Sequence, residues 1–121
     1  MSTQAVSPEK AWFILGELLE AVTEMNMLGY QHGDLHGNNV LWTGTNVVII
    51  DLGTAIYRGP VIDKYYAEDW KKISGTLERL FNTKGNRGHP LVRKYLRWKQ
   101  SIGKVPVRKL ADLYLEFSDV E

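Results

Sequence analysis

A block of polar residues and glycines lies between two segments with clear secondary-structure patterns. Residues 31–39 hold two histidines, two glycines, an aspartate and two asparagines. This block follows neither the helical period of 3.6 residues nor the strand period of 2, so it is predicted to be a loop. The elements on either side of the block must hold it in place, and they limit the folds that the chain can adopt.

The segment before this block is predicted to be a helix over residues 8–28. Ser7 suits the helix cap, Pro8 the first helical position and Glu9 the positive end of the helix dipole. Gly29 is a natural stop, because glycine accepts the left-handed conformation that often ends a helix. Apolar residues recur at the spacing of one helix face at Leu15, Leu18, Leu19, Val22 and Met25.

The segment after the block is predicted to be a β-hairpin. Residues 40–42 and 47–50 are rich in residues that favour strands, and 43–46 have turn chemistry. Residues 54–66 are predicted to be irregular, with Gly59–Pro60 as a breaker. Further helices are predicted over about 67–81, 91–100 and 107–117. The expected fold is therefore one domain over 1–121, mainly α-helical with a small β-hairpin.

Composition excludes several classes of function. The 121 residues include no cysteine, which excludes disulfides, thiolate metal sites and thiol catalysis. The apolar runs are far shorter than the roughly 20 residues that span a bilayer, and the N-terminus has no secretory pattern. We therefore expect a cytoplasmic, intracellular protein without membrane attachment.

Charge is segregated along the chain. Residues 79–111 carry ten basic and no acidic groups, although the whole chain has a net charge of only +1. This basic segment fits the solvated face of a helix, and it also fits attraction for an acidic partner. Tyr95 and Trp98 interleave with the charges at a spacing that suits burial, which disfavours nucleic-acid binding.

Three residues in and after the loop have the chemistry that phosphoryl transfer needs. This reaction needs a carboxylate that takes or orients the acceptor hydroxyl, and oxygen ligands that hold Mg²⁺ against the phosphates. Asp34 can serve as that carboxylate, and Asn39 and Asp51 can serve as the ligands. A hairpin after Asn39 would bring Asp51 back beside it, so the spacing predicts one compact site.

This arrangement resembles the protein-kinase-like superfamily, in which H-x-D-x-x-x-x-N is followed by two short strands and D-x-G. The local sequence His-Gly-Asp-Leu-His is most similar to the aminoglycoside-phosphotransferase and lipopolysaccharide-kinase branches. The resemblance covers residues 8–81, and 82–121 add a basic loop and C-terminal helices. The residues that carry it are His32, Asp34, Asn39 and Asp51–Leu52–Gly53.

The resemblance implies the C-terminal lobe of a kinase-like fold, with Mg²⁺ and ATP as ligands. It implies that Asp34 is catalytic and that Asn39 and Asp51 bind the metal and the nucleotide. His36 would lie near phosphate, or would be only a polar loop residue. Structural support would come from His32, which packs in the loop, from Gly53, which gives backbone freedom after Asp51, and from Asp69, which braces the loop backbone.

The chain also departs from this family pattern. It has no room for the small β-rich lobe, the glycine-rich loop or the lysine that holds the phosphates, so we expect weak ATP binding. Two hypotheses follow. The chain is a minimal phosphotransferase whose site another protein completes, or it is a non-catalytic kinase-like module, such as a decoy or an inhibitor. In either case the expected partner is a protein.

A rival motif overlaps the same block. Residues 33–37 also resemble the Gly-Asp-x-His-Gly signature of calcineurin-like metallophosphoesterases, in which the aspartate and histidine bind a metal pair. Two-metal hydrolysis needs further ligands downstream, and residues 85–89 resemble the motif that would supply them only loosely. A helix precedes the block here, where that signature follows a buried strand. The kinase-like assignment is therefore favoured.

Overall fold

The structure is a computed structural model that describes residues 5–44, 46–50, 52–59 and 63–118. The described part is mostly helical with two small antiparallel sheets, which confirms the predicted fold class. None of its helices is long and apolar enough to cross a membrane. In chain order the elements are α1 (Pro8–Met27), β1 (Tyr30–Gln31), η1 (Gly37–Asn39), β2 (Val40–Trp42), β3 (Val47–Ile49), η2 (Leu52–Thr54), β4 (Ile56–Tyr57), α2 (Asp63–Phe81), α3 (Pro90–Lys99) and α4 (Lys109–Ser118).

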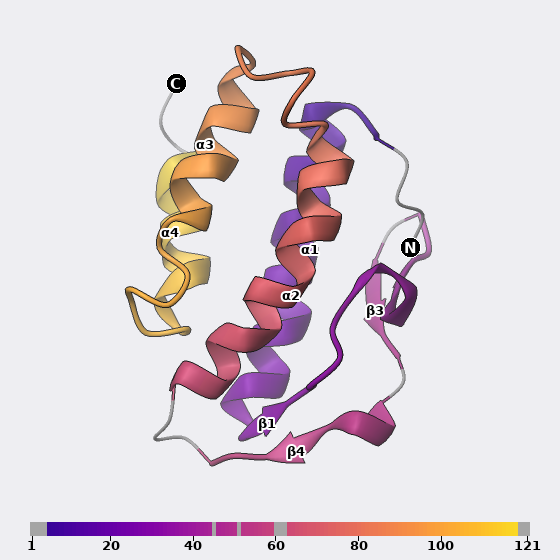
Figure 1. The fold of residues 1–121 in the computed structure, drawn as a ribbon, viewed down its shortest axis with the longest axis vertical. Coiled ribbons are helices and arrows are strands. Elements are labelled where there is room, and N and C mark those ends of the chain that lie inside the picture. Colours follow the sequence, from indigo (N-terminus) through magenta and orange to yellow (C-terminus); the bar gives the residue numbers. More distant parts are fainter. Residues whose placement is uncertain (1–4, 45, 51, 60–62, 119–121) are drawn as a thin grey trace.

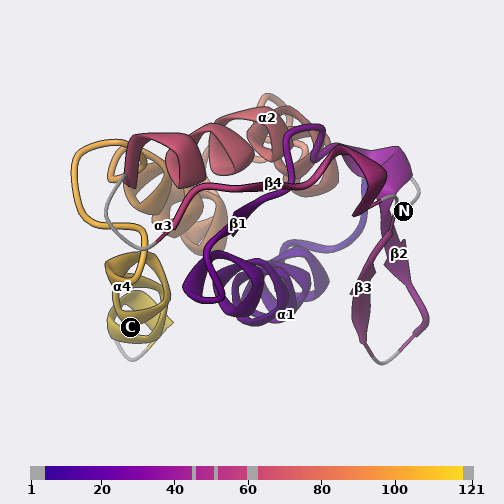
Figure 2. The same ribbon diagram turned by 90° about the horizontal axis from the view of Figure 1, so that it is seen from below.

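Helix α1 is the centre of the fold. It begins as predicted, because the Ser7 side chain accepts a hydrogen bond from the Lys10 amide and Pro8 occupies the first turn. It ends one residue before the predicted boundary, and Gly29 follows with a φ of +96°. Helices α1 and α2 lie side by side, and α3 and α4 pack along one side of this pair (Figure 1). Seen from below, α4 and the β2–β3 hairpin lie on opposite sides of α1 (Figure 2).

The hydrophobic core fills the space between these helices. The helical spacing predicted the buried face of α1 at Leu15, Leu18, Leu19 and Val22, and it also predicted Met25, which is partly buried. Ring contacts join α2 to α3, with Trp70 edge-on to Trp98 and Phe81 stacked on Tyr95. The largest fully buried side chains are Trp70, Trp98, Tyr95, Phe81, Ile14, Leu15, Leu18, Leu19, Leu35, Ile73, Leu77 and Leu80.

Helix α4 is attached to the core by two aromatic side chains. The Tyr114 ring stacks on Trp12 of α1, and its hydroxyl donates a hydrogen bond to the Trp12 carbonyl. The Trp98 indole N–H donates to the Leu110 carbonyl at 2.9 Å. Because both bonds join polar atoms that packing removes from water, they fix the position of α4 against α1 and α3.

One of the two sheets was predicted and the other was not. The β2–β3 hairpin is confirmed, with Val40 opposite Ile49 and Trp42 opposite Val47. The predicted irregular segment 54–66 is wrong at residues 56–57, because β4 pairs with β1. Gln31, predicted to lie in a loop, is also part of that pair. A two-residue strand has too little sequence pattern to be recognised, and a strand distant in the chain supplies its partner.

Helix α2 begins at Asp63, four residues before the predicted start. The sequence predicted irregular structure up to residue 66, with Gly59–Pro60 as a breaker. In the fold, Tyr66 is buried and its hydroxyl donates to the Gly59 carbonyl, while Arg58 lies over the Tyr65 ring. Tertiary packing therefore extends the helix. Helices α3 and α4 differ from their predicted bounds by one or two residues at each end.

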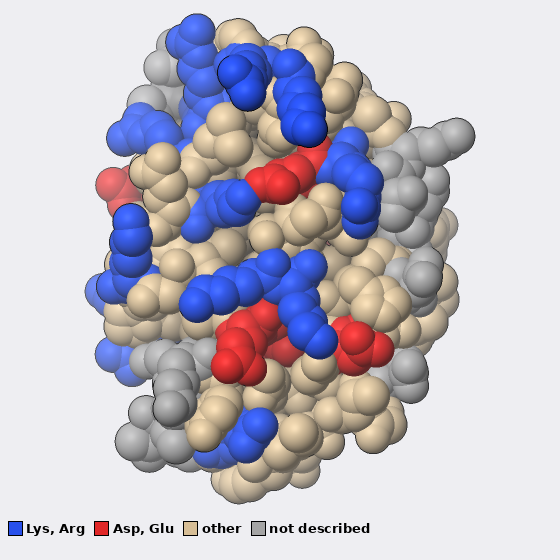
Figure 3. Space-filling view, viewed as in Figure 1, with Lys and Arg blue, Asp and Glu red and all other residues tan. Residues whose placement is uncertain are grey.

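The basic segment forms much of one face of the molecule. Lys and Arg side chains are spread over α2, α3 and the loop that joins them, with few acidic side chains between them (Figure 3). One of the acidic groups, Glu78, pairs with Lys99.

Candidate active site

The loop between β1 and β2 is held from within by His32. This side chain is fully buried, and its Nε2 lies 2.9 Å from the Ile50 carbonyl oxygen. Its Nδ1 accepts a hydrogen bond from the Asp34 amide at 3.2 Å. A carbonyl only accepts and an amide N–H only donates, so these partners assign the proton to Nε2. His32 thereby joins the start of the loop to Ile50, the residue that follows β3.

Asp69 of α2 holds the same part of the loop from the other side. Its carboxylate accepts hydrogen bonds from the His32 amide at 2.8 Å and the Gly33 amide at 3.0 Å. The side chain is fully buried. Burial raises the pKa of this carboxyl group above its ordinary value, although the hydrogen bonds from His32, Gly33 and Asn26 act in the opposite direction.

Gly33 lets the chain make its close turn at this point. Its φ is +88°, a conformation that glycine adopts more readily than other residues. A Cβ at this position would lie 3.0 Å from the Thr54 carbonyl oxygen. The Thr54 hydroxyl in turn donates to the His32 carbonyl at 2.8 Å. The backbone here has room for glycine and little more.

The Asp34 carboxylate faces outward, between two basic side chains. Its Oδ2 lies 3.4 Å from His36 Nε2, and its Oδ1 lies 3.8 Å from Nζ of Lys72. The Asp34 side chain is 43% exposed, so an acceptor molecule could reach it. The sequence motif includes Asp34 and His36 but not Lys72. The available signal was its spacing from Asp69, since residues three apart lie on one side of a helix.

Asn39 is buried beneath Asp34. Its amide nitrogen donates to the Asp34 carbonyl at 2.7 Å and lies 3.4 Å from His36 Nε2. Its backbone carbonyl accepts a hydrogen bond from the Ile50 amide at 2.9 Å. With the amide nitrogen engaged, Oδ1 is the side-chain atom that could act as a metal ligand. The loop therefore brings Asp34, His36 and Asn39 together, and the predicted approach of Asp51 to Asn39 falls outside the described residues.

The remaining residues of the predicted metal loop are Asp51 and Gly53. Asp51 lies outside the described residues. Gly53 lies exposed in η2, and it is not among the glycines with positive φ, so the special backbone freedom expected of it is not used there. Within the described residues, no three His, Asp or Glu side chains form a group that could hold a metal ion. The oxygen ligands available there are those of Asp34 and Asn39, a type that suits Mg²⁺.

Comparison with known families decides the assignment. Residues 3–93 match the model of the phosphotransferase enzyme family (APH). The chain belongs to this family. The match spans α1, the loop, both sheets, α2 and the start of α3, and the family is part of the protein-kinase-like superfamily, as the sequence predicted. No curated protein and no solved structure matches the chain.

His89 belongs to residues 85–89, which loosely resemble the rival metallophosphoesterase motif, and in the fold it caps a helix. His89 caps α3, where its Nδ1 accepts from the Leu91 amide at 3.1 Å. Its Nε2 lies 3.3 Å from Glu9 of α1. Capping and the contact with Glu9 give His89 a structural role, and its partners come from α1 and α3 and not from the loop of Asp34.

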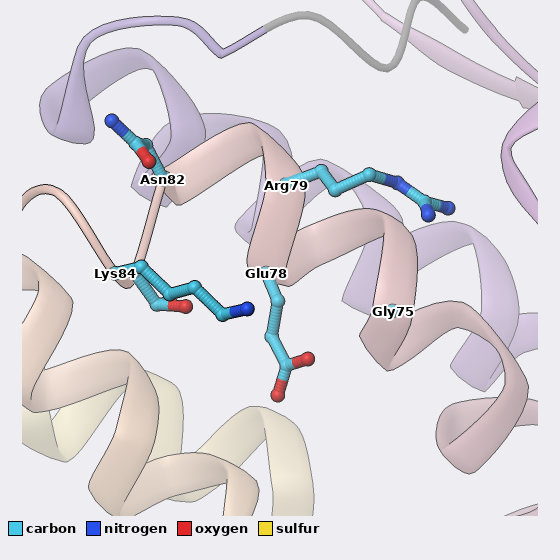
Figure 4. Close-up of a pocket in the computed structure, with 6 residues that line it drawn as sticks. Gly75, Glu78, Arg79, Asn82 and Lys84 are labelled. Atoms are coloured by element: carbon cyan, nitrogen blue, oxygen red, sulfur yellow. The ribbon is translucent and has the colours of Figure 1, made fainter.

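The hollows in the surface differ in character and position. One of about 470 Å³ lies at the C-terminal end of α2 and is lined by Gly75, Glu78, Arg79, Asn82, Thr83 and Lys84 (Figure 4). It includes no residue of the loop, so it is separate from the candidate active site. A second hollow is apolar and is lined by Ile49 and Leu52, together with Met25 and Leu28 at the C-terminal end of α1. Ile49 and Leu52 are close in sequence to Ile50, which is hydrogen-bonded to Asn39 and His32.

Proposed function

We propose that this chain takes part in Mg²⁺- and ATP-dependent phosphoryl transfer, with Asp34 as the group that acts on the acceptor. The observation that carries the proposal is the exposed Asp34 carboxylate on a loop tied to Asn39, in a member of the phosphotransferase enzyme family. Asp34 would orient an acceptor hydroxyl and take its proton. The new oxygen–phosphorus bond would form as the bond from the terminal phosphorus of ATP to ADP breaks.

Asn39 and Asp51 are the proposed ligands of Mg²⁺. Oxygen ligands suit this ion, and Asn39 offers Oδ1 because its nitrogen is bound to the Asp34 carbonyl. The ion would supply positive charge between the phosphates of the nucleotide. The contribution of the chain is then to position the acceptor and the phosphates, which is the main part of catalysis in phosphoryl transfer.

Titration calorimetry with ATP and Mg²⁺ tests the proposal. Binding at micromolar to low-millimolar affinity is expected, and it should be lost without Mg²⁺ and lost in Asp51→Asn. Asp112→Asn is a matched control, because Asp112 is an exposed aspartate on α4. No detectable heat at millimolar ATP, from a chain shown to be folded, would exclude the stand-alone nucleotide site.

We also propose that a partner protein completes the site. Large apolar side chains are exposed where α1, η2 and β4 meet, and Leu28, Leu52 and Tyr57 are each more than half exposed. Exposed apolar clusters of this kind favour a protein partner. A partner that covers this area would lie next to the loop of Asp34, because Leu52 follows closely after Ile50, which is hydrogen-bonded to Asn39 and His32.

The same exposed cluster favours the second candidate function, a kinase-like binding module without catalysis. Leu28→Glu should weaken either kind of partner binding, and Leu115→Glu is a matched control because Leu115 is exposed on α4. Asp34→Ala separates the two functions. It should abolish the effect of an enzyme and leave the effect of a binding module unchanged.

A further inference from the structure

The structure brings to the candidate site a cation to which the motif assigned no role. Lys72 lies one turn after Asp69 on α2, and both side chains bind the backbone of Gly33 in the loop. Asp69 accepts from the Gly33 amide, and the Lys72 ammonium donates to the Gly33 carbonyl at 3.0 Å. These bonds set the distance between α2 and the loop, so Lys72 has a defined place beside Asp34.

The Lys72 ammonium retains the capacity to bind a ligand. Its three N–H groups can point in three directions, and the Gly33 carbonyl takes one of them. The Asp34 carboxylate, 3.8 Å away, faces another. The Lys72 side chain is 54% exposed and the Asp34 side chain 43% exposed, so a ligand from solvent can reach both.

We propose that Lys72 binds the terminal phosphate of the donor nucleotide. This inference rests on the proposed function, in which Asp34 holds the acceptor hydroxyl next to that phosphate. A phosphoryl oxygen in contact with a hydroxyl on Asp34 would lie within reach of an ammonium 3.8 Å from the same carboxylate. The ammonium would offset the negative charge of the phosphoryl group, and charged hydrogen bonds of this kind are stronger than neutral ones.

A purely structural role for Lys72 makes a different prediction. If Lys72 only holds the Gly33 carbonyl, its loss would loosen the loop and weaken all nucleotides alike. If it binds the terminal phosphate, its loss would weaken ATP and spare ADP, which lacks that phosphate. The ratio of the two affinities therefore separates the two roles.

The test measures Mg²⁺-dependent binding of ATP and of ADP by NMR titration, which reaches millimolar dissociation constants. The variants are Lys72→Met, which keeps length and removes charge, and Lys72→Arg, which keeps the charge. Lys71→Met is the matched control, since Lys71 is also exposed on α2 and its Nζ lies 3.6 Å from the place of a Cβ on Gly103, in the loop before α4. Thermal unfolding shows that each variant is folded.

The expected result is a loss of about tenfold in ATP affinity for Lys72→Met, which corresponds to about 1.4 kcal/mol. ADP affinity should change less than twofold, Lys72→Arg should retain most of the ATP affinity, and Lys71→Met should match the wild type. Equal losses for ATP and ADP, or no loss, would overturn the role of Lys72 and leave the proposed function standing. A wild type that binds neither nucleotide would overturn both.

Discussion

Removing the Asp69 carboxylate tests whether α2 holds the loop. Besides the hydrogen bond from the Asn26 side chain, the Asp69→Ala variant loses two backbone hydrogen bonds, from the His32 amide at 2.8 Å and the Gly33 amide at 3.0 Å. Leaving a buried donor without an acceptor costs about 1–3 kcal/mol, and two are affected. Relief from burying the carboxylate offsets part of this cost, because burial raises its pKa. We expect a net destabilisation of about 2–4 kcal/mol, from these same terms.

Urea denaturation followed by tryptophan fluorescence measures this effect. Glu68→Ala is the matched control, because Glu68 is exposed and accepts one hydrogen bond from Gln31 at 3.0 Å. The control should lose less than about 1 kcal/mol, as surface substitutions generally do. If Asp69→Ala were no more destabilised than Glu68→Ala, the argument that this carboxylate braces the loop would be wrong.

The pH dependence of stability gives a second readout for the same residue. Because the folded pKa of Asp69 lies above its ordinary value of 3.8, the folded chain binds this proton more tightly than the unfolded chain. The stability that this tighter proton binding contributes is fully present below pH 3.8 and is lost as the pH rises through the folded pKa of Asp69. The free energy of unfolding of the wild type, relative to Asp69→Asn, should therefore increase as the pH falls from 7 towards 4. A decrease would contradict the sign of the shift.

Three further substitutions test the packing around the site and the core. Gly33→Ala should destabilise the fold by about 1 kcal/mol or more beyond the effect of Gly44→Ala. Both glycines have positive φ, but only at Gly33 would the new Cβ lie 3.0 Å from a backbone oxygen. Equal unfolding midpoints of the two variants would count against this close approach. Gly16→Ala should cost about 1–3 kcal/mol, because its Cβ would lie 2.6 Å from the Tyr114 hydroxyl. The same change in a Tyr114→Ala background should cost much less, and an unchanged penalty in that double variant would show that the ring is not the obstacle. Trp98→Phe removes the donor to the Leu110 carbonyl, so hydrogen exchange of α4 amides should accelerate more than that of α1; uniform acceleration would argue against a local attachment of α4.

Local signals made most of the fold and part of the site predictable. The Ser7 cap, the helical spacing of apolar residues and the turn at 43–46 each act within a few residues, and they located α1 and the hairpin to within about a residue. The loop motif itself brought Asp34, His36 and Asn39 together, because all three lie within six residues of one another. The same motif identified the family that the comparison confirmed.

Contacts between distant parts of the chain decided the rest. The β1–β4 pair and the bonds that hold the loop join residues far apart in sequence, with Asp69 37 residues from His32 and Lys72 39 residues from Gly33. No local period encodes such contacts, since they depend on how α2 packs against α1 and β1. The sequence by itself therefore determined α1, the β2–β3 hairpin, the family and the residues of the loop motif. Only the tertiary structure placed Lys72 beside Asp34, because the packing of α2 carries that side chain to the loop.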